Sequence, residues 1–225
     1  MKIFIVGSGK LANAIVYSKL SFQSCEIAKW ESKNEFSQEK SIIIHAGSGR
    51  QLQECVEFCT RTKSVFIELS TGLETENMEP DFPLIICPNT SLLVLKTLTL
   101  LKLNGKLFKN YEISITESHQ STKKTEPGTA YSFAKSLHFP IKEIVSVRKP
   151  EIQLHEIGIP QEFIEKHAYH KIVIKDGTDE LTIETKVFGH DSYAIGVKKI
   201  TESVLHNNFE NKKYSIFDLI NNNML

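Results

Sequence analysis

The segment 116–135, TESHQSTKKTEPGTAYSFAK, gathers chemically useful side chains between a predicted strand and a predicted helix. His119 can give or take a proton near neutral pH. Lys123 supplies a positive charge and Thr129 a hydroxyl group. The first N–H groups of a helix that starts after Gly128 attract anions. The segment therefore predicts a loop that holds a carboxylate beside a proton donor, as the reduction of a small carboxylate-bearing substrate by a nicotinamide requires.

A second chemical motif lies near the start of the chain. The stretch VGSGKLANA follows a short apolar run and precedes a helical pattern, which gives the spacing Gly7-x-Gly9-x-x-Ala12. Gly7 allows a tight turn, Gly9 lets the backbone approach a pyrophosphate, and Ala12 lets the helix lie close to the sheet. The motif predicts dinucleotide binding, and a plain tight turn is the alternative for so short a pattern.

An acidic residue is expected about 20 residues after such a glycine loop, where it holds the ribose hydroxyls. Glu31 stands at the end of the second predicted strand and fits this role. A carboxylate there repels a 2′-phosphate, so we expect NADH to be preferred and NADPH to be possible, with Lys29 and Lys33 able to soften the repulsion. Trp30, the single tryptophan, could stack on adenine or pack at the strand end.

The elements that would position these residues follow two patterns. In the first part of the chain, continuous apolar runs alternate with helical spacing, which is typical of a parallel sheet covered on both faces. The predicted strands are 2–6, 25–30, 41–47, 64–69 and 83–87, and the predicted helices are 10–20 and 50–62.

After Asn89 the pattern changes. A very apolar helix is predicted at 91–103, and the later strands alternate apolar and polar residues, which indicates one buried and one solvated face. These strands are 111–118, 141–148, 170–176 and 180–188, with an Asp-Gly hairpin turn at 175–180. Helical spacing returns at 196–205, and a last short helix is predicted at 214–220.

The predicted fold class is therefore α/β, with a Rossmann-type parallel sheet domain and a second α+β domain with an open mixed sheet. We expect residues 1–91 and 195–225 to form the dinucleotide-binding domain. Residues 92–194 are expected to bind substrate and to associate with other copies of the chain, because a single open sheet face is often covered by a partner.

Composition narrows the function classes. The 225 residues contain 27 Lys plus Arg and 27 Asp plus Glu, so no broad field favours nucleic acid or an acidic membrane. No apolar stretch is long enough for a membrane span, and the first apolar run is too short for a signal peptide. The four cysteines are expected to be reduced, buried thiols rather than metal ligands, which favours a cytoplasmic location.

At this point the sequence resembles the dihydrodipicolinate reductase family, now called 4-hydroxy-tetrahydrodipicolinate reductase. The family signature reads roughly E-x-H-H-x-x-K-x-D-A-P-S-G-T-A, and the chain has ESHQSTKKTEP-GTA from Glu117 to Ala130. CPNTSLLVLKTL resembles the family segment that joins the domains, ELSTGL occupies the place of its G-T-T-G, and HDSYAIGVKKITESVL resembles its end segment. The order and spacing agree over nearly the whole chain.

The chain also departs from the family at the site. The second histidine of the signature is Gln120, the Asp-Ala pair is Thr125-Glu126, and the serine before Gly-Thr is missing. The arginine that contacts substrate in the family aligns with His190, and an earlier histidine aligns with Thr185.

The resemblance implies hydride transfer from NAD(P)H to a cyclic unsaturated dicarboxylate in lysine and diaminopimelate biosynthesis, by a homotetramer. His119 would donate the proton and Lys123 would stabilise charge on the substrate, while Gln120, Gly128, Thr129 and His190 would bind it. The expected cofactor-binding residues are Gly7, Ser8, Gly9, Lys10, Leu11, Glu31, Ala46, Thr71, Cys87, Asn89 and Thr90. Two alternatives stay open: a reductase of a related substrate, and a nucleotide-binding relative without this activity.

Overall fold

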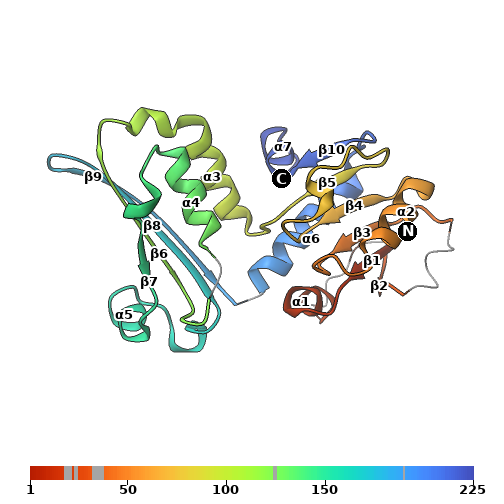
Figure 1. The fold of residues 1–225 in the computed structure, drawn as a ribbon, viewed down its shortest axis with the longest axis horizontal. Helices are drawn as coiled ribbons and strands as arrows, with labels where there is room; N and C mark the ends of the chain where they lie inside the picture. Colours follow the sequence, from red (N-terminus) through yellow and green to blue (C-terminus); the bar gives the residue numbers. More distant parts are fainter. Residues whose placement is uncertain (18–21, 23–24, 32–37, 124–125, 190) are drawn as a thin grey trace. The chain divides into compact units, whose positions relative to one another are not determined.

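The computed structural model describes residues 1–17, 22, 25–31, 38–123, 126–189 and 191–225. The chain divides into two compact units (Figure 1). Unit 1 contains Met1–Thr90 and His190–Leu225, and unit 2 contains Ser91–Gly189. Lys33, Thr125 and His190 lie outside the described residues.

Unit 1 is built on a parallel sheet with the strand order β10-β5-β4-β3-β1-β2. Its strands are β1 (Lys2–Val6), β2 (Glu26–Lys29), β3 (Ile42–His45), β4 (Val65–Glu68), β5 (Leu84–Ile86) and β10 (Lys213–Ser215). Its helices are α1 (Lys10–Tyr17), α2 (Leu52–Thr62), η2 (Glu74–Glu76), α6 (Asp191–His206) and α7 (Ile216–Asn221). The parallel sheet predicted from the continuous apolar runs is confirmed.

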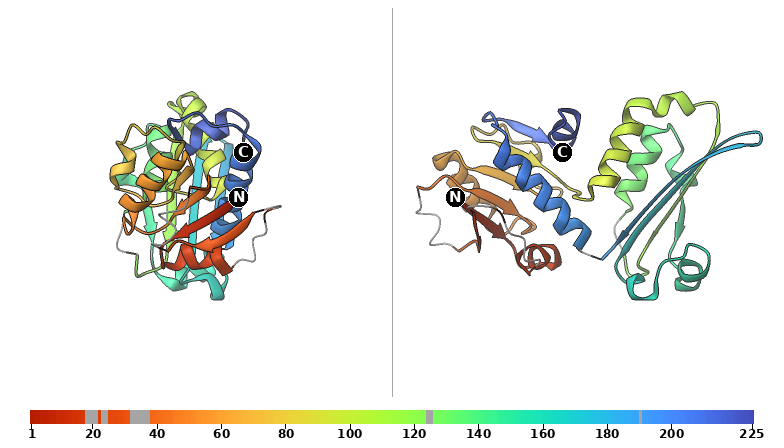
Figure 2. Two further views of the ribbon diagram at one scale, coloured as in Figure 1. Left: turned by 90° about the vertical axis from the view of Figure 1, so that its right-hand side faces the viewer. Right: turned by 180° about the vertical axis from the view of Figure 1, so that it is seen from behind.

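Helices cover both faces of this sheet, which explains why its strands are apolar without alternation. Helix α6 lies with α1 on one face, and α2 lies on the opposite face (Figures 1 and 2). Trp30 belongs to the core on the α2 side, with its ring centre 5.4 Å from that of Phe4 and 5.3 Å from that of Phe58. Of the two expectations for Trp30, packing at the strand end is therefore the one observed.

The predicted helix at 214–220 was wrong at its start. Residues Lys213–Ser215 form β10, which pairs with β5 at the edge of the sheet, and only then does α7 begin. The Ser215 side chain accepts a hydrogen bond from the Asp218 N–H, and Asp218 reciprocates, so this capping box sets the helix start. A strand this short shows no alternation of its own, and its partner strand alone defines it.

Unit 2 is a mixed sheet with the strand order β7-β6-β8-β9, in which β7 runs parallel to β6 and the other pairs are antiparallel. Its strands are β6 (Glu112–His119), β7 (Val145–Val147), β8 (His167–Asp176) and β9 (Asp179–Phe188). Its helices are α3 (Leu92–Asn104), η3 (Gly105–Phe108), α4 (Gly128–Ser136), η4 (Ile141–Glu143), α5 (Pro150–His155) and η5 (Gln161–Phe163). The open mixed sheet and the Asp-Gly hairpin are confirmed.

Helices α3 and α4 pack together over one face of this sheet (Figures 1 and 2). That face buries Ile115, Ile172, Ile174 and Val187, which is the apolar set expected from the alternation. Among the described residues, no helix is long and apolar enough to span a membrane.

Candidate active site

The carboxyl end of β6 carries the predicted proton donor. Glu117 and His119 stand two residues apart on the same strand, so their side chains point to the same face of the sheet. The Glu117 carboxylate is fully buried, and its Oε2 lies 2.7 Å from Nδ1 of His119. Its Oε1 accepts a hydrogen bond from Nη2 of Arg148 at 2.6 Å. The strand end therefore presents a histidine backed by a carboxylate, which an arginine holds in turn.

The charge of Glu117 follows from these partners. Burial alone would raise the pKa of Glu117, but the hydrogen bonds from His119 and Arg148 outweigh it and lower the pKa to about 2. Glu117 is thus a carboxylate at neutral pH, although water does not reach it.

A second histidine that the sequence analysis did not assign borders this group. His170 of β8 is buried, and its ring centre lies 5.8 Å from that of His119 and 5.5 Å from that of Phe133. Its Nδ1 lies 3.2 Å from Oγ1 of Thr185. Burial, with the nearby His119, lowers the pKa of His170 to about 3, so the ring is neutral. The alternation of β8 could have revealed it, because His170 shares the inner face with Ile172.

The backbone of the strand end is fixed from the other face of the sheet. Gln153 of α5 donates from Nε2 to the His119 carbonyl at 2.8 Å and to the Ser118 hydroxyl at 3.0 Å. His167 must donate from Nδ1, because its partner at 2.9 Å is the Ile164 carbonyl. Its Nε2 therefore accepts from the Ser118 hydroxyl at 2.9 Å. These side chains hold the chain at the position from which the His119 side chain projects.

The predicted carboxylate-binding loop follows β6 directly. The Lys123 N–H donates to the Gln120 carbonyl at 3.0 Å in a turn, and α4 begins at Gly128 as predicted. The N-cap of α4 is Pro127, whose side chain has no acceptor for the first turn. The Gly128 N–H donates to the Glu126 carbonyl at 3.0 Å. The structure thus brings His119, Gln120, Lys123 and the start of α4, including Thr129, into one connected stretch of unit 2.

The predicted cofactor residues follow the strands of unit 1. Gly7, Ser8 and Gly9 connect β1 to α1, which includes Lys10 and Leu11. The remaining predicted residues come after the other strands, Glu31 after β2, Ala46 after β3, Thr71 after β4, and Cys87, Asn89 and Thr90 after β5. Because these strands are parallel and adjacent, their carboxyl ends share one edge of the sheet, where α/β proteins bind ligands.

The first loop has room for a pyrophosphate. Gly7 has φ +118°, and a Cβ there would lie 2.5 Å from the Ala46 carbonyl oxygen, so only glycine fits. A Cβ added at Gly9 would meet nothing within 4 Å, which leaves space beside the backbone. The first turn of α1 contains no acidic residue to repel a phosphate. These features fit a dinucleotide at this loop.

Cys87 contributes no reactive thiolate to this edge. Burial raises the pKa of its thiol, and Sγ donates to the Asn89 carbonyl at 3.1 Å. The described cysteines are free thiols, and the described residues contain no group of three or more His, Cys, Asp or Glu that could hold a metal ion.

A buried polar pair that the sequence analysis missed lies beneath the same edge. His45 ends β3 and Glu68 ends β4, and their side chains are fully buried with Nδ1 of His45 2.8 Å from Oε1 of Glu68. The Ser70 N–H also donates to Oε1 of Glu68 at 2.8 Å. Nε2 of His45 lies 3.1 Å from the Arg50 carbonyl. The pair links the loops that follow β3 and β4.

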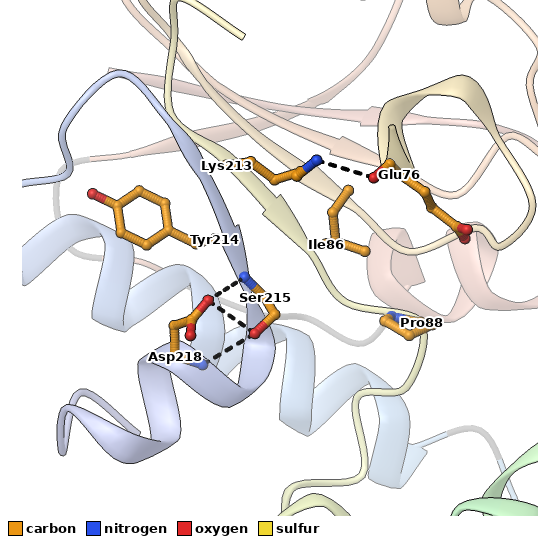
Figure 3. Close-up of a pocket in the computed structure, with 7 residues that line it drawn as sticks. All are labelled: Glu76, Ile86, Pro88, Lys213, Tyr214, Ser215 and Asp218. Atoms are coloured by element: carbon orange, nitrogen blue, oxygen red, sulfur yellow. Dashed lines mark hydrogen bonds between the residues drawn. The ribbon is translucent and has the colours of Figure 1, made fainter. Parts of the chain in front are cut away.

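Unit 1 also contains a pocket of about 500 Å³ beside β5 and β10 (Figure 3). It is lined by Glu76, Ile86, Pro88, Lys213, Tyr214, Ser215 and Asp218. Lys213 donates to the Glu76 carbonyl at 3.1 Å, and Asp218 accepts from the Ser215 N–H at 2.7 Å. Lys213 also donates to the Met78 carbonyl at 3.1 Å, and these lining residues include none of the predicted site residues.

Residues 94–220 match the family model described as dihydrodipicolinate reductase, C-terminus. The chain belongs to this family. The resemblance seen in the signature around His119 is therefore confirmed at the level of the dihydrodipicolinate reductase family.

Individual dihydrodipicolinate reductases agree with this assignment. A probable 4-hydroxy-tetrahydrodipicolinate reductase 2, chloroplastic, from Oryza sativa subsp. japonica is 34% identical over 96 residues, which are 40% of this chain and 30% of that protein. The match thus spans less than a third of the rice protein. The 4-hydroxy-tetrahydrodipicolinate reductase of Clostridium perfringens is 26% identical over 200 residues, which cover 80% of this chain and 76% of that protein.

A solved structure shows the same fold. The dipicolinate-bound dihydrodipicolinate reductase from Paenisporosarcina sp. TG-14 superposes with a TM-score of 0.66 at 15% identity, covering 96% of this chain and 97% of that one. The α/β architecture with a parallel sheet and a second mixed sheet is therefore that of dihydrodipicolinate reductase.

Proposed function

We propose that this chain is an NAD(P)H-dependent reductase of 4-hydroxy-tetrahydrodipicolinate, the cyclic unsaturated dicarboxylate of lysine and diaminopimelate biosynthesis. The observation that carries the proposal is the end of β6, where His119 is held by an ionised Glu117 and is followed by Lys123 and the start of α4. Family membership and the dicarboxylate named for the solved relative support the same substrate class.

In the proposed reaction, the 4-hydroxyl group of the substrate leaves as water, which creates a ring C=C bond. A bound nicotinamide would supply the hydride for one carbon of this bond, and His119 donates a proton to the neighbouring carbon, so that hydride and proton together saturate it. Lys123 places its charge near a substrate carboxylate before and during this step. Thr129 and the first N–H groups of α4 orient the carboxylate, and Gln120 can donate a hydrogen bond but carries no charge. His190 is proposed as a further substrate contact.

The cofactor is proposed to bind at the carboxyl edge of the unit 1 sheet. Gly7, Gly9 and the start of α1 would hold the pyrophosphate, and the exposed Glu31 would accept the ribose hydroxyls. Repulsion of a 2′-phosphate by Glu31 should favour NADH over NADPH by about 1–3 kcal/mol, the scale of a charged hydrogen bond. Lys29, which could soften this repulsion, has its Nζ 5.8 Å from the ring centre of Tyr17. Comparison of the two cofactors by titration tests this preference, and equal or tighter binding of NADPH refutes it.

A coupled assay tests the activity. The dicarboxylate is generated by its synthase, and loss of NADH or NADPH is followed by absorbance. General acid catalysis contributes roughly 10²–10⁴-fold, so His119→Ala should lower turnover at least about 100-fold while cofactor affinity stays unchanged. Lys123→Ala should change both the Michaelis constant and turnover. Full activity of His119→Ala would refute its role.

A nucleotide-binding relative without this activity is the second candidate. The Gly128 N–H is engaged by the Glu126 carbonyl rather than directed to a ligand, which favours a weakened carboxylate site. In that case the protein binds NADH but oxidises none of it with the dicarboxylate at any pH.

Self-association, as a homotetramer, is proposed through the sheet face of unit 2 that α3 and α4 leave uncovered. Cross-strand neighbours on that face include Glu112, Lys175 and Glu180, and Nζ of Lys175 lies 3.1 Å from Oε2 of Glu180. A contact through so polar a face should weaken as salt increases. Light scattering at low and high salt tests this, and a monomer at micromolar concentration in both refutes it.

A further inference from the structure

We propose that Glu117 is a positioning residue that fixes the tautomer and the charge of His119, with Arg148 as its anchor. This inference rests on the proposed function, in which His119 is the proton donor, and it assigns a distinct role to each ring nitrogen. Nδ1 donates a hydrogen bond to Glu117, and Nε2 transfers the proton to the substrate.

The geometry determines which nitrogen transfers the proton. An ionised carboxylate only accepts hydrogen bonds, so the contact of 2.7 Å between Oε2 of Glu117 and His119 requires a proton on Nδ1. The His119 side chain is 13% exposed, whereas the Glu117 side chain is fully buried. Nε2 is therefore the nitrogen left to face a ligand, and the proton that it loses to the substrate is replaced from solvent after product release.

The position of the ring is fixed on both sides of the strand. Arg148 holds the other carboxylate oxygen at 2.6 Å, while its own Nη1 donates to the Val147 carbonyl at 2.9 Å. Gln153 holds the His119 carbonyl at 2.8 Å. A carboxylate anchored by a cation cannot turn away from the imidazole, so the ring keeps one orientation.

The surrounding charges explain why a carboxylate is needed. The charged and titratable groups around His119 are Glu117 on its own strand, His167 and His170 on β8, and Arg148 beyond Glu117, while Lys123 in the following loop acts on His170. Arg148 is a cation and disfavours a charged imidazole. His167 and His170 are buried rings whose pKa values are lowered, chiefly by burial, so they are neutral and add no charge. Among these described groups, Glu117 is the one that favours the imidazolium form, which is the proton donor.

The central test removes the negative charge of the Glu117 side chain while keeping its size and shape. Glu117→Gln should shift the limb of the turnover–pH profile that reports His119 to lower pH by about 1–3 units, the effect of an opposite charge at this distance. Turnover at pH 7.5 should fall at least about 10-fold, with cofactor affinity unchanged. The matched control is Glu143→Gln, at an exposed position of η4 in the same unit, which should leave the profile unchanged.

Arg148→Gln should shift the same limb of the turnover–pH profile in the opposite direction. It removes a cation but keeps an amide N–H that can still hold the Glu117 carboxylate, so the same limb should move to higher pH. No shift in either variant, or a shift to lower pH in both, overturns the inference. Because a merely structural role would not move the two variants in opposite directions, this pair separates positioning from loss of stability.

A measurement on the unmodified protein does not depend on activity. In two-bond ¹H–¹⁵N spectra of histidine-labelled protein, with His119 identified by its absence in His119→Ala, the neutral ring should carry its proton on Nδ1. A proton on Nε2 overturns the inference even if the enzyme is active. A proton on Nδ1 in a protein that does not reduce the dicarboxylate supports the inference and refutes the proposed function instead.

Discussion

Removal of His45 should destabilise unit 1 more than the conservative core truncation Ile44→Val on the same strand. Both nitrogens of His45 face oxygen acceptors, the Glu68 carboxylate at 2.8 Å and the Arg50 carbonyl at 3.1 Å. We expect the ring to donate from both nitrogens, which would make the pair a fully buried imidazolium and carboxylate.

The magnitude follows from what remains after substitution. In His45→Leu, the Glu68 carboxylate keeps the Ser70 N–H at 2.8 Å and a weaker contact with the Thr75 hydroxyl at 3.5 Å, but it has no counter-charge. Breaking a buried pair by removing one partner costs about 3–5 kcal/mol. Glu68→Leu should cost less, about 1–3 kcal/mol, because the Nε2 contact of His45 with the Arg50 carbonyl remains and the main loss is the hydrogen bonds to the Glu68 carboxyl group.

The double variant His45→Leu/Glu68→Leu separates pairing from packing. Its cost should be smaller than the sum of the two single variants by about 2 kcal/mol, since neither charge is then left alone. Ile44→Val, on the same strand, is the matched control and should cost about 1 kcal/mol.

Urea unfolding followed by Trp30 fluorescence measures these values. Trp30 is the single tryptophan, and it packs against Phe4 and Phe58 in the unit 1 core, so its signal reports this unit. A cost below about 1 kcal/mol for His45→Leu, or additive single variants, would refute the buried ion pair.

Two further outcomes are expected. The pKa of Glu117 is lowered to about 2, so its ionised form stabilises unit 2 above the ordinary carboxyl pKa. This stability, on the order of 3 kcal/mol, is lost as the pH falls from about 4.5 to 2. Acid titration by circular dichroism should therefore show a flatter curve for Glu117→Gln, and identical curves would contradict the assignment. Gly196→Ala should lower the melting temperature measured by calorimetry, because its Cβ would lie 1.7 Å from the Thr90 carbonyl oxygen and the backbone must shift, which outweighs the gain of about 1 kcal/mol in helix propensity; an unchanged or higher melting temperature would show that the contact relaxes.

The sequence alone predicted those structural features that depend on residues close by in the chain. The apolar run of β3 predicts a buried strand by itself, and the spacing of Gly7 and Gly9 predicts a turn into a helix. The start of α4 at Gly128 was likewise predicted, because a proline before the helix limits where it can begin. These features depend on neighbours within a few residues.

Pairings across strands were not predictable in the same way. Glu117 and Arg148 are 31 residues apart, and they meet only because β7 pairs with β6 in a parallel register. His45 and Glu68 are 23 residues apart and meet only because they are opposite one another in the β3–β4 register. A glutamate inside an apolar run is therefore ambiguous in the sequence, since its partner depends on the order of strands in the sheet.

The buried, ionised Glu117 at the end of β6 bears on the choice between an enzyme and a nucleotide-binding relative. Keeping Glu117 ionised without contact with water has a desolvation cost that Arg148 and His119 must offset. A protein that only binds a nucleotide in unit 1 gains nothing from this arrangement in unit 2, where apolar side chains of similar volume would be as stable. An enzyme gains a histidine with one orientation, one tautomer and a favoured charge. The altered carboxylate loop, from Gln120 to Gly128, then argues for weaker or different substrate binding, whereas the intact Glu117–His119 pair argues that proton transfer has been kept.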